Sequence, residues 1–133
     1  MNHEITVHEE EAYVEAKAVG PASVDKTRLL LTEIISQPGW SPEFCVLLDL
    51  AGLETDRLDA AEIREISDVF RAFGADLGTG CCAVVTARTV DYGLARMWQT
   101  MTEDDFPLDI RIFRSLPEAE SWIRGRNERV ALA

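Results

Sequence analysis

The chain has few positively charged side chains compared with negatively charged ones. Lys and Arg together number 13 against 24 Asp and Glu, which gives a formal net charge of −11 over 133 residues. Coulomb repulsion opposes the binding of so acidic a chain to phosphate backbones and to anionic lipid surfaces. We therefore expect no nucleic-acid partner.

Long apolar stretches are also missing. No apolar run in the sequence approaches the ~20 residues that a helix needs to span a bilayer. Residues 1–4 lack the basic start and the apolar core of a secretion signal. We expect no membrane insertion and a cytoplasmic location.

Cysteine is scarce, with three residues in the chain. Cys81 and Cys82 are neighbours in a run predicted to be a strand, so their side chains point to opposite faces and cannot easily bridge each other. We interpret the three cysteines as reduced, buried thiols. Cys45, Cys81, Cys82, His3 and His8 also lack the Cys-x-x-Cys or His-x-x-x-His spacing that places metal ligands on one face. We expect no metal site and no cofactor.

Groups for nucleophilic catalysis are equally hard to find. The sequence has no Gly-x-Ser-x-Gly elbow, and neither Cys81 nor Cys82 has an identifiable histidine partner. Gly74, Gly78 and Gly80 lead into a strand-like run instead of a helix, which argues against a phosphate-binding loop. We favour a non-enzymatic function, and an enzyme remains the weaker alternative.

Alternating strand and helix patterns are what the chain does contain. Residues 4–8 and 12–19 alternate apolar and polar side chains and predict a hairpin through residues 9–11. An apolar stripe over residues 24–35 predicts the first helix. The apolar run at residues 44–48 is typical of a strand covered on both faces, and therefore predicts the middle of a sheet.

The second half of the chain repeats this alternation. Asp59 and Glu62 form a predicted capping box that opens a helix, and Gly74 is expected to close it. A strand from Cys81, a helix, a second strand and a last helix follow. Ser115 and Glu118 form the predicted capping box of the last helix, whose packing we assign to Ala119, Trp122 and Ile123.

The order of elements is β-β-α-β-α-β-α-β-α. Strands that alternate with helices imply parallel pairs joined by right-handed crossovers, and the leading hairpin adds an antiparallel edge. No repeat, low-complexity segment or linker divides the chain. We predict a single α/β domain with a mixed sheet over residues 1–125, followed by a C-terminal tail over residues 126–133 that frays.

Several apolar segments together resemble a known family. They are residues 45–53 (CVLLDLAGL), 83–86 (AVVT), 92–97 (YGLARM), 110–114 (IRIFR) and 118–123 (EAESWI). In these segments, which extend over nearly the whole chain, the sequence resembles the SpoIIAA-like branch of the STAS-like family. The resemblance implies a sheet flanked by helices, and a small regulatory or partner-binding domain rather than an enzyme.

A phosphorylation switch is the family feature to compare. The resemblance extends to STAS domains that antagonise anti-sigma factors, which carry a phosphorylated Ser or Thr in an Asp-Ser-containing turn after the central strand. The matching segment here, residues 49–59, has no such turn, and its only hydroxyl belongs to Thr55, between Glu54 and Asp56. A phosphate between two carboxylates is disfavoured unless Arg57 or a helix N-terminus compensates. Thr55 is thus a candidate phosphorylation site that electrostatics opposes.

The best candidate ligand site lies where the strand from Cys81 meets the next helix, the edge at which open α/β sheets bind ligands. An anion could sit on the amides near Asp91, with Arg88 or Arg96 pairing it, although Asp91 is more simply an N-cap. Asp49, at the end of the central strand, could act as a base, but capping of loop amides is favoured. The predicted ligand-binding residues are Asp49, Thr86, Arg88, Thr89, Asp91, Tyr92 and Arg96.

Two function classes remain. The first is a non-enzymatic regulatory or protein-interaction module that offers a helix face to a protein partner or to a second copy in a homodimer. The second is a domain that binds a small-molecule or lipid-like ligand in a pocket at the C-terminal ends of the central strands. Exposed apolar helix faces would favour the first class, and an enclosed pocket would favour the second. The sequence favours the first.

Overall fold

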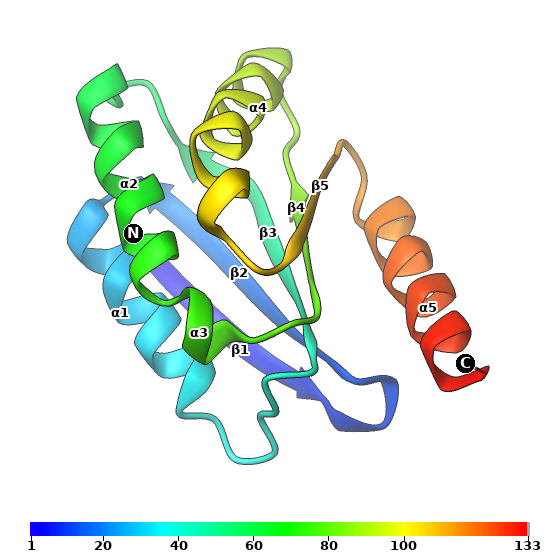
Figure 1. The fold of residues 1–133 in the computed structure, drawn as a ribbon. Helices are drawn as coiled ribbons and strands as arrows, with labels where there is room; N and C mark the ends of the chain where they lie inside the picture. The colour runs from blue at the N-terminus through cyan, green and yellow to red at the C-terminus, as the bar shows by residue number, and fades with distance from the viewer. Residues whose placement is uncertain (133) are drawn as a thin grey trace.

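Five strands form one mixed sheet in the order β1-β2-β3-β4-β5 (Figure 1). The computed structural model describes residues 1–132. β1 and β2 form the predicted antiparallel hairpin, and β3, β4 and β5 each pair in parallel with the preceding strand. The central position of β3 confirms the interpretation of its apolar run. The strands are β1 (Asn2–His8), β2 (Tyr13–Pro21), β3 (Cys45–Glu54), β4 (Cys81–Val85) and β5 (Asp109–Phe113).

Helices connect the parallel strands and cover both faces of the sheet. α1, α2 and α4 lie against one face, while α5 lies alone against the other (Figure 1). The order of strands and helices agrees with the predicted α/β pattern. The helices are α1 (Val24–Ile35), α2 (Ala60–Ala72), α3 (Gly74–Leu77), α4 (Thr89–Thr102) and α5 (Leu116–Leu132), with 3-10 turns η1 (Glu9–Glu11) and η2 (Glu103–Asp105).

The sheet separates two apolar layers because side chains alternate along each strand. Val46 and Leu48 of β3 face α1, α2 and α4, and they belong to a large cluster that includes Phe70 and Trp98. Leu47, between them, belongs to a smaller cluster beneath α5. This two-sided burial of β3 explains its nearly continuous apolar sequence.

The helix termini differ from the prediction in three places. α4 begins at Thr89, so Arg88 is its N-cap residue and Asp91 lies in its first turn. Gly74 opens the short α3 instead of simply closing α2. The segment predicted to fray from residue 126 is helical through Leu132. The other two predicted caps are present, since Asp59 accepts from the amide of Glu62 and Ser115 accepts from the amide of Glu118.

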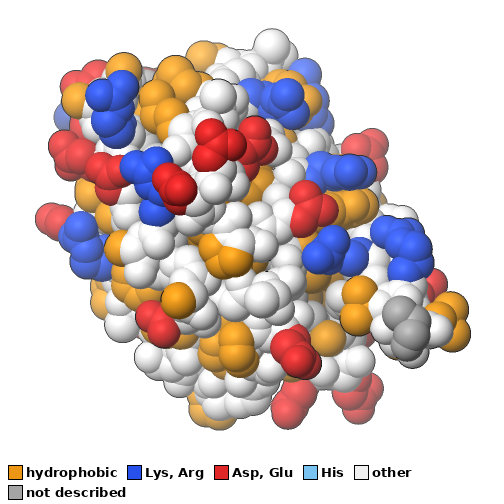
Figure 2. Space-filling model, viewed as in Figure 1, with side chains coloured by type: hydrophobic (Ala, Val, Ile, Leu, Met, Phe, Trp, Pro, Cys, Tyr) orange, Lys and Arg blue, Asp and Glu red, His pale blue; other side chains and the backbone are white. Residues whose placement is uncertain are grey.

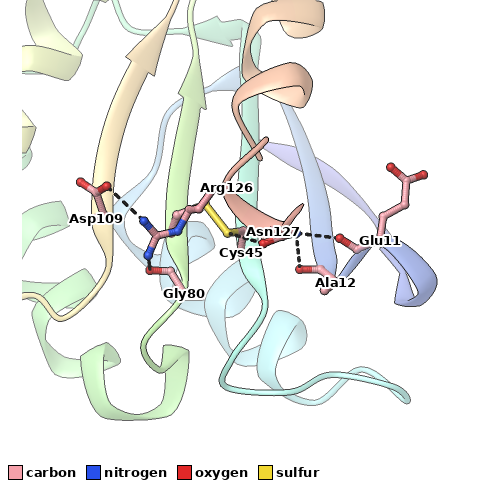
Figure 3. The surroundings of a disulfide bond; sticks show 8 residues. Glu11, Ala12, Cys45, Gly80, Asp109, Arg126 and Asn127 are labelled. Atoms are coloured by element: carbon pink, nitrogen blue, oxygen red, sulfur yellow. Dashed lines mark hydrogen bonds and ion pairs between the residues drawn. A yellow bond between two sulfur atoms is a disulfide. The ribbon is translucent and has the colours of Figure 1, made fainter. Parts of the chain in front are cut away.

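A disulfide joins Cys45 and Cys81, with a Cα–Cα distance of 4.4 Å (Figure 3). The interpretation of all three cysteines as reduced thiols was therefore wrong for this pair. The two residues begin neighbouring parallel strands, whose ladder continues from Val46 opposite Cys82, so they meet across the sheet despite their separation in sequence. Cys82 is free and buried, as predicted, and burial raises the pKa of its thiol to about 12.

Within residues 1–132, no helix combines the length and the apolar composition that a membrane span requires.

Candidate functional site

An apolar pocket lies between α2, α4 and the C-terminal ends of β3 and β4. It encloses a cavity of about 100 Å³ and opens to the surface. In the space-filling view, hydrophobic side chains are exposed between the upper ends of α2 and α4 (Figure 2). The apolar walls include Leu48, Leu50, Val84, Leu94, Ala95 and Trp98.

The walls come from the same apolar stripes that build the core. Leu48 and Leu50 point to one face of β3, because residues two apart share a face of a strand. Leu94 and Trp98, four residues apart, share a face of α4. α2 closes the other side with Phe70, whose ring meets the Trp98 indole edge-to-face at a centroid distance of 4.8 Å. The pocket is thus a gap within the core layer, and not a separate structural unit.

Trp98 is 8% exposed, and its indole N–H has no hydrogen-bond partner among residues 1–132. Buried indole N–H groups usually find a partner. Trp98 therefore lines the pocket and also carries a buried donor without a partner in the described part of the chain.

Polar groups gather at one end of the pocket. The Thr55 hydroxyl, in the loop after β3, donates a hydrogen bond to the carboxylate of Asp91 on α4. Arg88 holds the same carboxylate through two contacts, Nε to Oδ2 at 2.8 Å and Nη2 to Oδ1 at 3.2 Å. Arg88 also donates to the Thr55 hydroxyl at 3.1 Å and to Asp56 at 3.2 Å. These bonds tie the β3–α2 loop to the start of α4.

The charges in this group stabilise one another. The Arg88 guanidinium holds the pKa of the Asp91 carboxyl below its ordinary value, and the Thr55 hydrogen bond acts in the same direction against the opposing effect of burial. Hydrogen bonds to Asp91 and Asp56 raise the pKa of Arg88. Because Arg88 already donates to two carboxylates and a hydroxyl, its guanidinium has little capacity left for an external anion.

Three of the residues predicted to bind a ligand meet at this end of the pocket. Thr86 and Asp91 line it, and both side chains are buried, at 3% and 5% exposure. Arg88 holds Asp91 in place. The prediction that Asp91 caps α4 is wrong, since the N-cap position belongs to Arg88 and the Asp91 carboxylate instead binds Arg88 and Thr55.

The structure places the other predicted residues elsewhere. Asp49 lies between two pocket-lining leucines of β3, so its side chain points to the opposite face, where it accepts from the Ala51 amide at 3.3 Å. Thr89 accepts from Arg114 at 3.0 Å, and the Arg114 guanidinium lies 5.8 Å from the ring centroid of Tyr92.

Arg96 is exposed on α4, and its guanidinium makes no hydrogen bond or ion pair within the part of the chain described. The anion site expected from Arg88 and Arg96 together is therefore not assembled.

Sequence reasoning missed Asp56 and the apolar walls, and it placed Thr55 in a different role. Thr55 and Asp91 are 36 residues apart, and no spacing rule connects them. The residues of the walls were recognised only as core residues, because an apolar helix or strand face that lines a cavity has the same sequence pattern as one that is fully packed.

For metals, residues 1–132 contain no group of three or more His, Cys, Asp or Glu side chains arranged to hold an ion.

Comparison with known proteins defines the fold. No protein-family model matches the sequence, and no curated protein matches it. A similar solved structure is the crystal structure of an uncharacterized protein from the DUF3478 family with a SpoIIAA-like fold, from Shewanella loihica PV-4. The two share 18% sequence identity with a TM-score of 0.60, and the match covers 92% of each chain. The chain thus has a SpoIIAA-like α/β fold, as the sequence resemblance implied.

Proposed function

We propose that this chain is a non-enzymatic binding module that takes a small neutral apolar molecule, or the apolar end of a larger one, into the pocket between α2 and α4. The supporting observation is the apolar cavity at the C-terminal ends of β3 and β4, with its polar groups gathered at one end. Open α/β sheets bind ligands at this edge, and binding pockets usually combine apolar walls with a few polar groups.

The cavity volume limits the group that enters. An apolar cavity of roughly 150 Å³ in another protein holds benzene. The cavity here, at about 100 Å³, suits a smaller group such as the isopropyl end of a branched alkyl chain, and the rest of the chain would lie in the opening of the pocket. Burial of about five carbons in the cavity and its opening, at roughly 0.8 kcal/mol each, corresponds to a dissociation constant of the order of 1 mM. A tighter ligand would extend beyond the pocket.

The charges near the pocket favour a neutral ligand over an anion. Asp91 lines the cavity as a carboxylate, and Asp56 lies on the other side of Arg88. A ligand carboxylate would have to compete with both for a single guanidinium, in a chain whose net charge is −11. A ligand hydroxyl avoids this repulsion and can hydrogen-bond to a threonine such as Thr86.

A regulatory role through a protein partner is the second proposal, and it rests on the SpoIIAA-like fold. The exposed face of α4, which would have to contact the protein partner, offers little apolar surface. Trp98 and Thr102 of α4 are buried, and Val90, at 57% exposure, is its one exposed large apolar residue. A concave apolar pocket that opens to the surface, without a broad apolar helix face, favours the ligand-binding proposal.

Phosphorylation of Thr55 stays a prediction that its surroundings oppose. The hydroxyl already bonds to Asp91 and Arg88, so a phosphate would have to displace these bonds. It would then lie close to the carboxylates of Asp56 and Asp91, with Arg88 as the neighbouring cation.

The experiment that tests the ligand-binding proposal is an NMR titration of the 15N-labelled protein with 3-methylbutan-1-ol. The indole N–H resonance of Trp98 should shift because the alcohol enters beside this ring. The resonances of Trp40 and Trp122, which do not line the pocket, should move much less. A parallel titration with 3-methylbutanoate presents the same carbon skeleton as an anion, and should bind at least about tenfold more weakly.

Arg96→Ala is the matched control, since it changes an exposed residue of the same helix. It should bind the alcohol as the wild type does. Absence of a Trp98 shift with the alcohol would overturn the proposed function, whereas equal binding of the carboxylate would overturn only the preference for a neutral ligand.

A further inference from the structure

The disulfide between Cys45 and Cys81 lies beneath α5, on the face of the sheet opposite the pocket, and takes no part in the ligand site. We propose that this pair is a reversible thiol–disulfide site, and that the C-terminal turns of α5 control access to it. Its co-reactants would be low-molecular-weight dithiols and disulfides.

The backbone aligns the two cysteines independently of the bond between them. Cys45 and Cys81 begin β3 and β4, and the parallel ladder continues directly with Val46 opposite Cys82. The Cα atoms are 4.4 Å apart, within the range that a disulfide requires. Because the ladder holds the strands together, the sulfur atoms remain neighbours after reduction, and the bond can re-form without a change of fold.

α5 covers the sulfur atoms. Cys45 and Cys81 are 1% and 0% exposed, and they share an apolar cluster with Ala119 and Ile123 of α5. Asn127 Oδ1 lies 3.8 Å from Cys45 Sγ (Figure 3). Thiol–disulfide exchange requires a thiolate to reach one sulfur atom directly. A reagent can do so only when this part of α5 moves away.

Side-chain contacts hold the C-terminal part of α5 in place. Arg126 donates to the Gly80 carbonyl at 3.3 Å and to Asp109 at 3.4 Å. Asn127 Nδ2 donates to the Glu11 carbonyl at 2.7 Å (Figure 3). Residues 128–132 beyond them are exposed. A helix end held by few contacts opens locally at a lower free energy than the whole domain unfolds.

Asn127 is suited to both redox states of Cys45. In the disulfide, Cys45 has no S–H, so the neighbouring Asn127 oxygen receives no hydrogen bond from it. After reduction, the Cys45 thiol can donate a weak hydrogen bond to the same oxygen. α5 can therefore close over the reduced pair as well as over the oxidised pair, which permits a reversible reaction.

The reaction balances with a dithiol as the reductant. One reagent thiolate attacks a cysteine sulfur, the S–S bond breaks, and a mixed disulfide forms. The second reagent thiol then displaces this cysteine, leaving two protein thiols and a cyclic reagent disulfide that has given up two electrons. Oxidised glutathione reverses the reaction by accepting two electrons and leaving as two thiols. Cys82 points to the other face of the sheet and takes no part.

The test measures the rate at which dithiothreitol reduces the folded protein, with alkylation after denaturing quench and thiol counting by mass spectrometry. The oxidised protein should show one free thiol, and the reduced protein three. Asn127→Ala and Arg126→Ala should each speed reduction at least about tenfold, because they release the end of α5. Arg129→Ala, an exposed change on the same helix, should stay within about twofold of wild type.

Ile34→Val controls for global unfolding, since Ile34 is buried in α1 on the other face of the sheet. Ile34→Val should lower the free energy of unfolding but should not speed reduction, whereas the α5 variants should speed it. If Ile34→Val speeds reduction as much as Asn127→Ala does, for the same loss of stability, then reduction follows global unfolding and the inference is overturned. The reduced, folded protein should return to one free thiol when it is incubated with oxidised glutathione. Three free thiols after this incubation would also overturn the inference.

Discussion

Asp91 connects the sequence pattern with the candidate site at the scale of a single residue. An acid in the first turn of a helix is typical of an N-cap, and also of an ion pair near the helix start. The sequence could not distinguish these roles, because the deciding partner, Thr55, is 36 residues away. Arg88, three residues before Asp91, was the part of the network that local spacing could suggest.

Asp91→Asn should lower the free energy of unfolding by about 1 to 2 kcal/mol near neutral pH, because Arg88 loses a charged partner. The pKa of Asp91 is lower in the folded chain than in the unfolded chain. Its ion pair therefore stabilises the fold above the unfolded pKa of about 4, and this contribution is lost as the pH falls through the folded pKa.

Urea unfolding near neutral pH and at about pH 3 checks this prediction. The wild type should lose more stability than Asp91→Asn as the pH falls, since the variant has no carboxylate at this position to protonate. The same loss in both proteins would mean that the Asp91–Arg88 pair does not stabilise the fold.

At the scale of elements, local patterns predicted most of the secondary structure. The apolar stripes of α1 and α2 and the double-sided burial of β3 depend on residues close together in sequence, so they could be identified directly. The end of α5 could not, because residues 126–132 have no apolar stripe and their anchors, Gly80 and Glu11, lie far away in the chain. The start of α4 was missed because Thr89 and Val90 are exposed and add nothing to its buried face.

The packing of α5 is tested by Ile123→Ala. Ile123 is fully buried beneath the sheet, so truncation should cost about 2 to 5 kcal/mol. Val130→Ala is the control, because Val130 is 65% exposed and its loss should change stability by less than about 0.5 kcal/mol. Denaturant unfolding compares the two. A loss below about 1 kcal/mol for Ile123→Ala would contradict the docking of α5 on the sheet.

Trp122 contributes less to this packing than its sequence position indicated. It is only partly buried, with its ring 5.6 Å from that of Phe113 and the Arg111 guanidinium 5.1 Å from its ring centroid. Ala119 and Ile123, which the same prediction assigned to the packing of this helix, are both fully buried. The prediction is therefore confirmed for these two residues, and Trp122 lies at the edge of the buried face.

At the scale of the whole molecule, the sheet separates the two candidate sites. The pocket lies on the face covered by α2 and α4, and the disulfide lies on the face covered by α5. Neither could be predicted, since a cavity depends on how three elements pack and a disulfide depends on which strands become neighbours. The sequence nevertheless indicated the edge of the sheet at which the pocket lies, because the ends of β3 and β4 follow from the predicted strand order.

The most direct measurement of the central claim is the affinity of Ala95→Leu for 3-methylbutan-1-ol. Ala95 lines the pocket, so the larger side chain fills space that a ligand would occupy. The account predicts a folded variant whose affinity is at least about tenfold lower than that of the wild type, while Arg96→Ala, on the exposed side of α4, binds normally. Equal affinity of Ala95→Leu and the wild type would show that the alcohol binds elsewhere and would contradict the pocket as the binding site.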